Sequence, residues 1–205
     1  MADRSDSNVA AYARRAISYE RGVRGHLHRR IAERVAALAV AAAPRGGRIL
    51  DVGCGTGSLL RAMATQRPDL VTLIGIDPAA PMVEVARGRA VADSRMRFET
   101  GTAEMLPFPD GAFDVVVSSA SFAHWADQPA GVHECARVLH ADGTLVLADV
   151  FTTARLPVGI FGPGGAPHSQ QRAATALADS GFFAVQWRPV FAGVIRVAIA
   201  SGRRS

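Results

Sequence analysis

The 205-residue chain contains no lysine, because all 23 of its basic residues are arginine. A phosphate-binding P-loop needs a lysine beside its glycine-rich turn, so the composition excludes that class of nucleotide site. Residues 1–45 hold nine arginines against four acidic residues, and the rest of the chain holds 14 of each. The net charge of +5 therefore lies in the first segment. Basic segments can bind nucleic acid or an acidic membrane surface, but these arginines do not alternate with aromatic residues, which favours a solvated helical face.

Cysteine is also scarce, since Cys54 and Cys135 are the two in the chain. No cysteine and histidine pair has zinc-ligand spacing, so we expect no metal site and no disulfide scaffold. A reducing, cytoplasmic location follows as the expectation. The apolar run at residues 35–44 is too short to span a bilayer, and the acidic N-terminus does not resemble a secretory signal.

Apolar periodicity predicts one α/β domain. A helical segment is expected over residues 8–43, broken near Gly22 and Gly25. Short apolar strands then alternate with helices, which predicts a doubly wound, mostly parallel sheet with helices on both faces. The expected strands are 48–52, 71–77, 96–101, 113–119, 144–151, 183–191 and 194–201, and the expected helices are 58–66, 81–91, 129–140 and 169–180. The last two strands are joined by Ala192-Gly193, a connection that permits only an antiparallel hairpin.

The first of these strands runs into a glycine-rich turn. Gly53, Gly55 and Gly57 occupy every second position, which lets the backbone approach a ligand where a Cβ atom would clash. A dinucleotide fingerprint would place glycine where Ser58 stands, so the spacing disfavours a nicotinamide cofactor. Asp77 ends the next strand, 20 residues after Gly57, where a carboxylate can accept both hydroxyls of a ribose. The turn and this carboxylate together predict a nucleoside site.

Three motifs resemble those of the class I S-adenosylmethionine-dependent methyltransferases, in particular the small-molecule branch that includes ubiquinone/menaquinone biosynthesis methyltransferases. They are Asp51-Val-Gly-Cys-Gly-Thr-Gly, Gly75-Ile-Asp-Pro and the segment Gly101-Thr-Ala-Glu-Met-Leu-Pro-Phe-Pro-Asp-Gly-Ala-Phe-Asp. The resemblance covers residues 48–201. It implies a Rossmann-like, seven-stranded sheet with an antiparallel C-terminal hairpin, S-adenosyl-L-methionine as methyl donor, and a small-molecule acceptor.

The same resemblance implies roles for individual residues around this cofactor. Gly53, Gly55 and Gly57 would lie beneath its methionine and ribose parts, Asp51 near its amino group, Asp77 on the ribose hydroxyls, Pro78 and Met82 beside the adenine, Ala103 and Glu104 at the adenine edge, and Ser118 at the end of the fourth strand. Thr102 stands where family members often carry an aspartate that accepts from the adenine amine. A neutral hydroxyl accepts a weaker hydrogen bond than a carboxylate, so we expect reduced cofactor affinity.

A second similarity concerns the N-terminus. Residues 11–13 and 17–21, which include Tyr19, resemble the tyrosine-containing segment that closes over the cofactor in relatives. We therefore expect residues 1–43 to form a helical lid and residues 44–205 to form the cofactor-binding methyltransferase domain.

Methyl transfer from a sulfonium is an in-line displacement, so the enzyme mainly holds the acceptor and the methyl group together in a dry site. His124, just after the fourth strand, is the candidate catalytic base, with simple packing as an equal alternative. Residues 118–121 lack the motifs of enzymes that methylate nucleic-acid bases, which favours a small molecule over nucleic acid as the partner. We expect a monomer or homodimer. The alternatives are a cofactor-binding protein without catalysis and a nicotinamide-dependent reductase.

Overall fold

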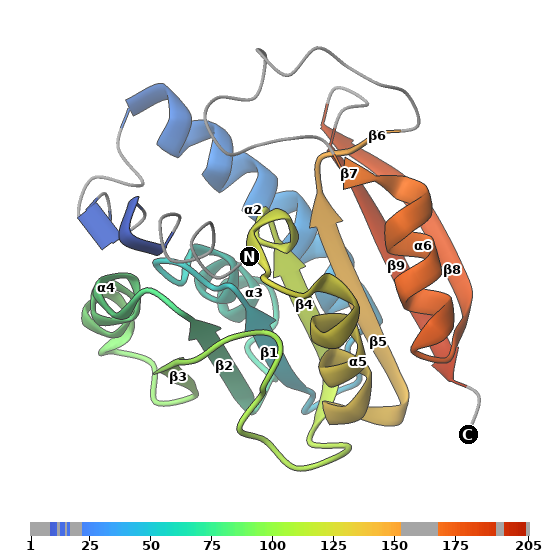
Figure 1. Cartoon of the computed structure of the whole chain (residues 1–205). Coiled ribbons are helices and arrows are strands. Elements are labelled where there is room, and N and C mark those ends of the chain that lie inside the picture. Colours follow the sequence, from blue (N-terminus) through green and yellow to red (C-terminus); the bar gives the residue numbers. More distant parts are fainter. Residues whose placement is uncertain are drawn as a thin grey trace.

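A computed structural model describes residues 9–11, 13–14, 16, 22–152, 168–191 and 195–203. Its centre is a seven-stranded sheet with the order β3-β2-β1-β4-β5-β9-β8, shown in Figure 1. The strands are β1 (Arg48–Val52), β2 (Thr72–Asp77), β3 (Met96–Thr100), β4 (Phe113–Ser119), β5 (Leu139–Asp149), β8 (Phe182–Phe191) and β9 (Ile195–Arg203). Strands β1 to β5 pair in parallel, and β9 lies antiparallel between β5 and β8. This arrangement confirms the predicted α/β fold class and the antiparallel C-terminal hairpin.

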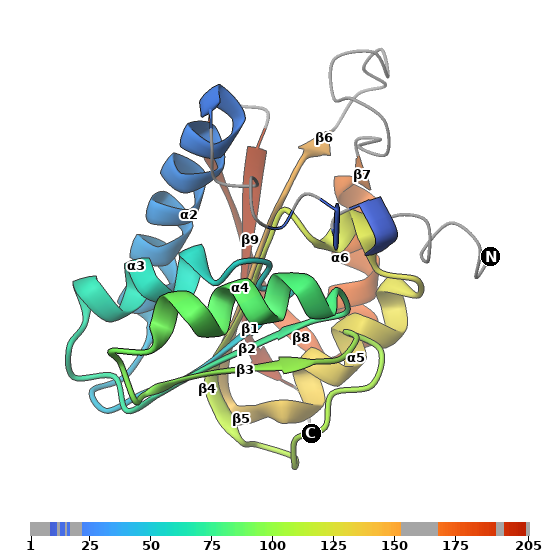
Figure 2. The same ribbon diagram turned by 90° about the vertical axis from the view of Figure 1, so that its left-hand side faces the viewer.

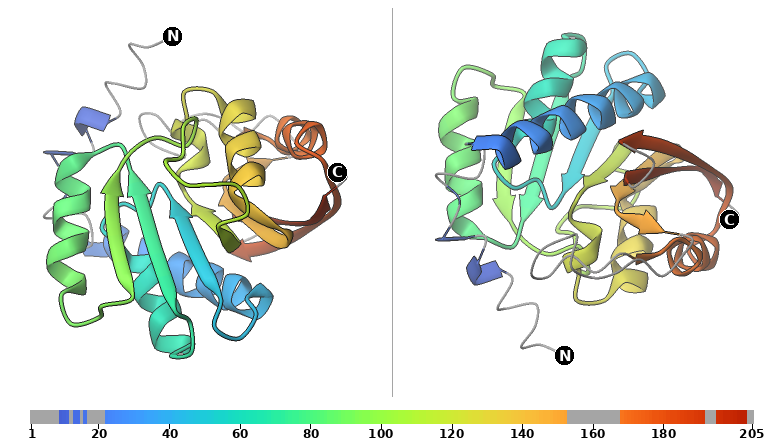
Figure 3. Two further views of the ribbon diagram at one scale, coloured as in Figure 1. Left: turned by 90° about the horizontal axis from the view of Figure 1, so that it is seen from below. Right: turned by 90° about the horizontal axis from the view of Figure 1, so that it is seen from above.

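Helices cover both faces of the sheet (Figures 2 and 3). They are α2 (Gly22–Ala42), α3 (Ser58–Gln66), α4 (Ala80–Ala90), α5 (Gln128–Val138) and α6 (Gln170–Asp179), with a 3-10 helix η2 (Phe122–His124). Alternate strand residues point to opposite faces, so Ile49 packs with α2, α3 and α4, whereas Leu50 packs with α5 and α6. None of the helices among the described residues is long and apolar enough to cross a membrane.

Two local details differ from the sequence-based prediction. Strand β5 begins at Leu139, because Leu139 pairs with Phe113 before an irregularity shifts the register, so the segment expected as a helix end and glycine turn is part of the strand. A short parallel pair, β6 (Phe151–Thr152) and β7 (His168–Ser169), also forms outside the main sheet. Both depend on pairing between distant segments, which local periodicity does not report.

Helix α2 is a layer of the core. It runs without a break from Gly22 through Gly25, so the predicted break at Gly25 is wrong. Its buried face packs with α3 and the sheet and consists of Ile31, Ala32, Val35, Ala36, Ala39 and Val40. A helix with such a face cannot leave the sheet without exposing that apolar surface to water. The expected boundary between a lid at residues 1–43 and the domain at residues 44–205 therefore does not separate two packing units.

A lid formed by the residues before α2 stays a prediction. Tyr19 lies outside the described residues, as does most of that segment. Of its described residues, Val9 and Ala16 form a small apolar cluster with Ala79 and Met82. The segment therefore contacts the loop and helix that follow β2.

An ion pair joins the starts of two neighbouring parallel strands. The Arg48 guanidinium donates from Nε and Nη2 to the two carboxylate oxygens of Asp114, each over 3.1 Å, and the Arg48 backbone N–H donates to Oδ2 over 2.8 Å. Burial opposes ionisation of Asp114, but these hydrogen bonds hold its pKa below the usual value. Asp114 therefore links β1 to β4 at the edge where these strands begin.

We expect Asp114→Asn to lower the free energy of unfolding by about 1 kcal/mol at pH 7, a modest loss because water screens a half-exposed guanidinium. The folded-state pKa of Asp114 lies below the unfolded value, so this stabilisation is present at neutral pH and is lost as the pH falls through the lowered pKa. Urea unfolding at pH 7 and near pH 3 measures it. Asp142→Asn, at an exposed position of β5, is the control. An equal difference at both pH values contradicts the prediction.

Candidate active site

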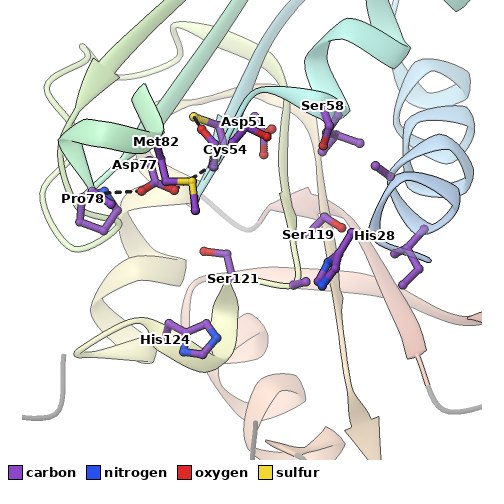
Figure 4. A pocket seen from close by; sticks show the side chains of 18 of the residues that line it. His28, Asp51, Cys54, Ser58, Asp77, Pro78, Met82, Ser119, Ser121 and His124 are labelled. Carbon is purple, nitrogen blue, oxygen red and sulfur yellow. Dashed lines mark hydrogen bonds between the residues drawn. The ribbon is translucent and has the colours of Figure 1, made fainter. Parts of the chain in front are cut away.

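A cavity opens at the carboxyl ends of β1, β2 and β4 (Figure 4). Its walls come from the glycine turn after β1, the loop after β2, the segment after β4 and one side of α2. Seven of the predicted site residues line it: Asp51, Gly53, Gly55, Asp77, Pro78, Met82 and His124. Residues from three separate strand ends therefore meet in one place, as the sheet topology requires.

The glycine turn needs its glycines for two different reasons. A Cβ atom on Gly53, which has φ 77°, would lie 1.8 Å from the Ser121 Oγ atom, so only glycine lets this turn pack against the segment after β4. Gly55 has φ 52° and lines the cavity, and no described atom lies within 4 Å of the place its Cβ would occupy. The turn therefore leaves an open cradle above its backbone.

The Asp77 carboxylate connects this turn to the next segment. Its Oδ2 atom accepts a hydrogen bond of 2.9 Å from the Gly55 N–H, and its Oδ1 atom accepts one of 2.9 Å from the Ala79 N–H. Burial raises the pKa of Asp77, and the two backbone donors oppose that rise. Each carboxylate oxygen keeps a second acceptor direction for a ligand hydroxyl. The N-cap residue of α4 is Ala79, so Asp77 holds the loop before the helix instead of capping it.

Asp51 is the most unusual group in the cavity. Its side chain is 1% exposed, and neither carboxylate oxygen has a hydrogen-bond partner among the described residues. Burial, and secondarily the negative charge of Asp77, raise the pKa of Asp51 well above its ordinary value. A buried carboxylate without a partner is unfavourable, and a ligand ammonium group would supply both the opposite charge and the hydrogen bonds. The residue therefore fits the amino end of the cofactor that the sequence motifs imply.

Polar side chains border the other end of the cavity. Ser119 is the last residue of β4, and Ser121 and His124 come from the segment after it, where Ala120 adopts a left-handed conformation with φ 55°. His28 reaches the cavity from α2 (Figure 4) and was missed by the sequence analysis. The available signal was its position one helical turn before the buried Ile31. This end can hold a small polar molecule between two imidazoles and two hydroxyls.

Five predicted cofactor residues do not line the cavity. Thr102 is exposed, Ala103 is buried in the core, and Ser118 is buried in β4. Glu104 accepts hydrogen bonds of 2.7 and 3.1 Å from the N–H groups of the two residues before α5. Gly57 packs against Phe98, since a Cβ atom on Gly57 would lie 2.8 Å from the Phe98 ring. Glu104 and Gly57 thus have structural roles, and contact of the five with a cofactor stays a prediction.

Within the described ranges, no group of three or more histidine, cysteine or acidic residues could hold a metal ion. Cys54 lines the cavity as a buried free thiol, and burial raises its pKa well above the usual value. A thiol with a raised pKa is a poor nucleophile at neutral pH. Cys54 is therefore a packing residue of the glycine turn.

Comparison with known proteins finds similarity to methyltransferases. Residues 50–147 match the family model for a methyltransferase domain. The chain is 35% identical over 114 residues to the ubiquinone/menaquinone biosynthesis C-methyltransferase of Geotalea uraniireducens, covering 54% of this chain and 48% of that protein. It is 40% identical over 118 residues to the 27-O-demethylrifamycin SV methyltransferase of Amycolatopsis mediterranei, covering 56% of this chain and 42% of that protein. The chain thus spans about half the length of these curated relatives.

Among solved structures, the fold resembles the methyltransferase crystallised with the Trm112 activator of Haloferax volcanii, with a TM-score of 0.76 at 20% identity over 94% of this chain and 98% of that one. It also resembles a SAM-dependent methyltransferase of Thermotoga maritima, with a TM-score of 0.69 at 22% identity. These likenesses concern the fold. Residues 50–147 thus match a methyltransferase domain by sequence, within a fold that resembles those of SAM-dependent methyltransferases.

Proposed function

We propose that the protein transfers a methyl group from S-adenosylmethionine to a small-molecule acceptor. The observation that carries this proposal is the pairing, in one cavity, of a buried Asp51 without a partner and an Asp77 fixed by two backbone amides. The first suits an ammonium group and the second suits a pair of ribose hydroxyls. S-adenosylmethionine carries both groups, the ammonium on its methionine part and the hydroxyls on its ribose.

Different cavity residues bind different parts of this cofactor. Asp77 accepts hydrogen bonds from the ribose hydroxyls, and Asp51 pairs with the amino group of the methionine part. Pro78 and Met82 provide an apolar surface beside the adenine, and Gly55 lets the backbone lie against the ligand. When bound, S-adenosylmethionine supplies an electrophilic methyl group on a positively charged sulfur.

The acceptor then lies at the polar end of the cavity. Ser119 and Ser121 orient it by hydrogen bonding, and a ring nitrogen of His124 receives the proton that a hydroxyl or amine acceptor loses as it attacks the methyl group. Ile31, Ala32 and Leu59 form an apolar wall that excludes water from the transfer. One relative is named as a C-methyltransferase and another for a 27-O-demethyl substrate. The proposal therefore includes oxygen, nitrogen and carbon as acceptor atoms.

Two further features are part of the proposal. Cys54 and Cys135 are both free and buried, which suits a reducing cytoplasm. The acceptor is a small metabolite and not a nucleic acid, since the lining of the described cavity includes no arginine for a phosphate backbone. The protein works as a monomer or a homodimer.

Asp77→Ala should weaken binding of S-adenosylhomocysteine by about a hundredfold or more, because two hydrogen bonds to a charged acceptor contribute about 1.5 to 3 kcal/mol each. Isothermal titration calorimetry measures the affinity, and Asp179→Ala, at an exposed position of α6, is the matched control. Parallel titration with NADH should show no binding. An unchanged affinity in a folded Asp77→Ala protein, or tight binding of NADH, contradicts the assignment of the cavity.

Turnover distinguishes an enzyme from a protein that only binds the cofactor. We expect transfer of radiolabelled methyl groups to at least one member of a panel of small phenols, amines and enols. His124→Gln should lower kcat by about 10²-fold or more for a hydroxyl or amine acceptor, with little change in cofactor affinity. Binding without any transfer across the panel supports the non-catalytic alternative.

Cofactor binding should release a proton from Asp51. In the free protein the raised pKa favours the protonated carboxyl, whereas a bound ammonium group favours the ionised form. The affinity for S-adenosylhomocysteine should therefore rise with pH while the pH lies below that raised pKa, by at most about tenfold per pH unit. Calorimetry in two buffers of different ionisation enthalpy counts the released protons. Asp51→Asn should abolish this release, and Asp179→Asn should leave it intact; release that persists in Asp51→Asn assigns it to another group.

A further inference from the structure

The segment after β4 carries the polar end of the cavity but belongs to no sheet. Ser119, Ser121 and His124 all lie on it or at its start, and its regular structure is limited to the three residues of η2. A short irregular segment keeps one conformation only if bonds from other elements hold it. The position of the acceptor residues therefore depends on these anchors.

One anchor is a buried carboxylate at the end of the neighbouring strand. Asp149 is 5% exposed, and its Oδ2 atom accepts a hydrogen bond of 3.0 Å from the Ala123 N–H, inside η2 and next to His124. Its Oδ1 atom accepts one of 2.7 Å from the Val150 N–H. The first N–H groups of a helix have no partner within the helix, so the carboxylate satisfies a donor that η2 cannot satisfy itself.

The register of the sheet explains why Asp149 can reach this point. Ser119 pairs with Ala148 in the β4–β5 ladder, and the Ala120 N–H donates to the Ala148 carbonyl over 2.8 Å. The left-handed turn at Ala120 then directs the chain back over the end of β5. Asp149 follows Ala148 directly, so its side chain meets the first turn of η2.

Further anchors hold the residues on either side of Ala123. Gln128 donates from Nε2 to the Phe122 carbonyl over 3.0 Å, and Trp125 donates from its ring N–H to the Ser121 Oγ atom over 3.2 Å. The Phe122 ring contacts the ring of Trp125 at 5.2 Å between centroids and that of Phe151 at 5.7 Å. Glu104 binds the residues before α5, beyond His124. Asp149 thus acts where the segment carries its acceptor residues.

We propose that Asp149 is a positioning residue, which fixes η2 through the Ala123 N–H so that Ser121 and His124 face the acceptor end of the cavity. Asp149 itself does not line the cavity among the described residues. Its effect on catalysis rests on the proposed function, but its effect on the conformation of η2 does not.

Trp125 offers a reporter that needs no acceptor. The chain has two tryptophans, so Trp187→Phe leaves Trp125 as the single one, half-buried beside η2. In this background, Asp149→Ala should raise the acrylamide quenching of Trp125 at least about twofold, because the loosened turn admits the quencher. Asp149→Asn, which keeps one acceptor oxygen, should give a smaller rise. Asp142→Ala, an exposed aspartate of the same strand, should leave quenching unchanged.

Measurements of binding and activity distinguish a positioning role of Asp149 from general damage to the fold. Asp149→Ala should bind S-adenosylhomocysteine within about threefold of the wild-type affinity, since small displacements of the acceptor end leave the cofactor contacts in place. With an acceptor that the wild-type protein methylates, kcat should fall about ten- to hundredfold, with the KM for S-adenosylmethionine unchanged. Asp149→Asn should recover part of this loss.

Unchanged quenching of Trp125 in a folded Asp149→Ala protein overturns the proposal, as does a loss of cofactor affinity equal to the loss of kcat. If Asp149→Ala does not fold, the quenching of Trp125 is compared between Asp149→Asn and Asp142→Asn. Equal quenching in these two variants then overturns the proposal. A wild-type protein that methylates no acceptor, but whose Trp125 is loosened by Asp149→Ala, contradicts the proposed function and supports the placement of η2 by Asp149.

Discussion

The pair of hydrogen bonds from the Gly55 and Ala79 N–H groups to the Asp77 carboxylate is the interaction on which the site depends. It joins the turn after β1 to the loop before α4, two segments that belong to neighbouring strands but to separate stretches of sequence. With these bonds made, the glycine turn stays open and Pro78 and Met82 face the same cavity. A single carboxylate thus sets the shape of the site and keeps acceptor capacity for a ligand.

Asp51 shows the opposite arrangement, a carboxylate that the protein leaves without a hydrogen bond among its described residues. A buried carboxyl group without a hydrogen bond is unfavourable, and burial favours its protonated form. The two aspartates lie close enough for the charge of Asp77 to raise the pKa of Asp51. In the proposed function, a cation bound at Asp51 would relieve both the desolvation and the repulsion.

The two ends of the cavity are built in different ways. The cofactor end uses backbone turns fixed by glycine and by Asp77, whereas the acceptor end uses a short irregular segment held by side chains from elsewhere in the fold. Helix α2 closes one wall and contributes His28, although its apolar face also belongs to the core. One helix therefore both supports the sheet and lines the cavity.

The sequence by itself determined the order and type of the main helices and strands, the antiparallel hairpin, the glycine turn, and seven residues of the cavity, including Asp51, Asp77 and His124. The elements, the glycine turn, Asp77 and His124 follow from short-range rules: apolar periodicity, the backbone freedom of glycine, and the meeting of parallel strands at their carboxyl ends. Asp51, Pro78 and Met82 came from the resemblance of the motifs to class I methyltransferases. Only the tertiary structure decided that α2 is a core layer, that His28 lines the cavity, and that Glu104 and Asp149 hold the segment after β4. Each of these is a contact between segments that are distant in the sequence. The packing of helices and strands determines such contacts, and the local sequence pattern does not.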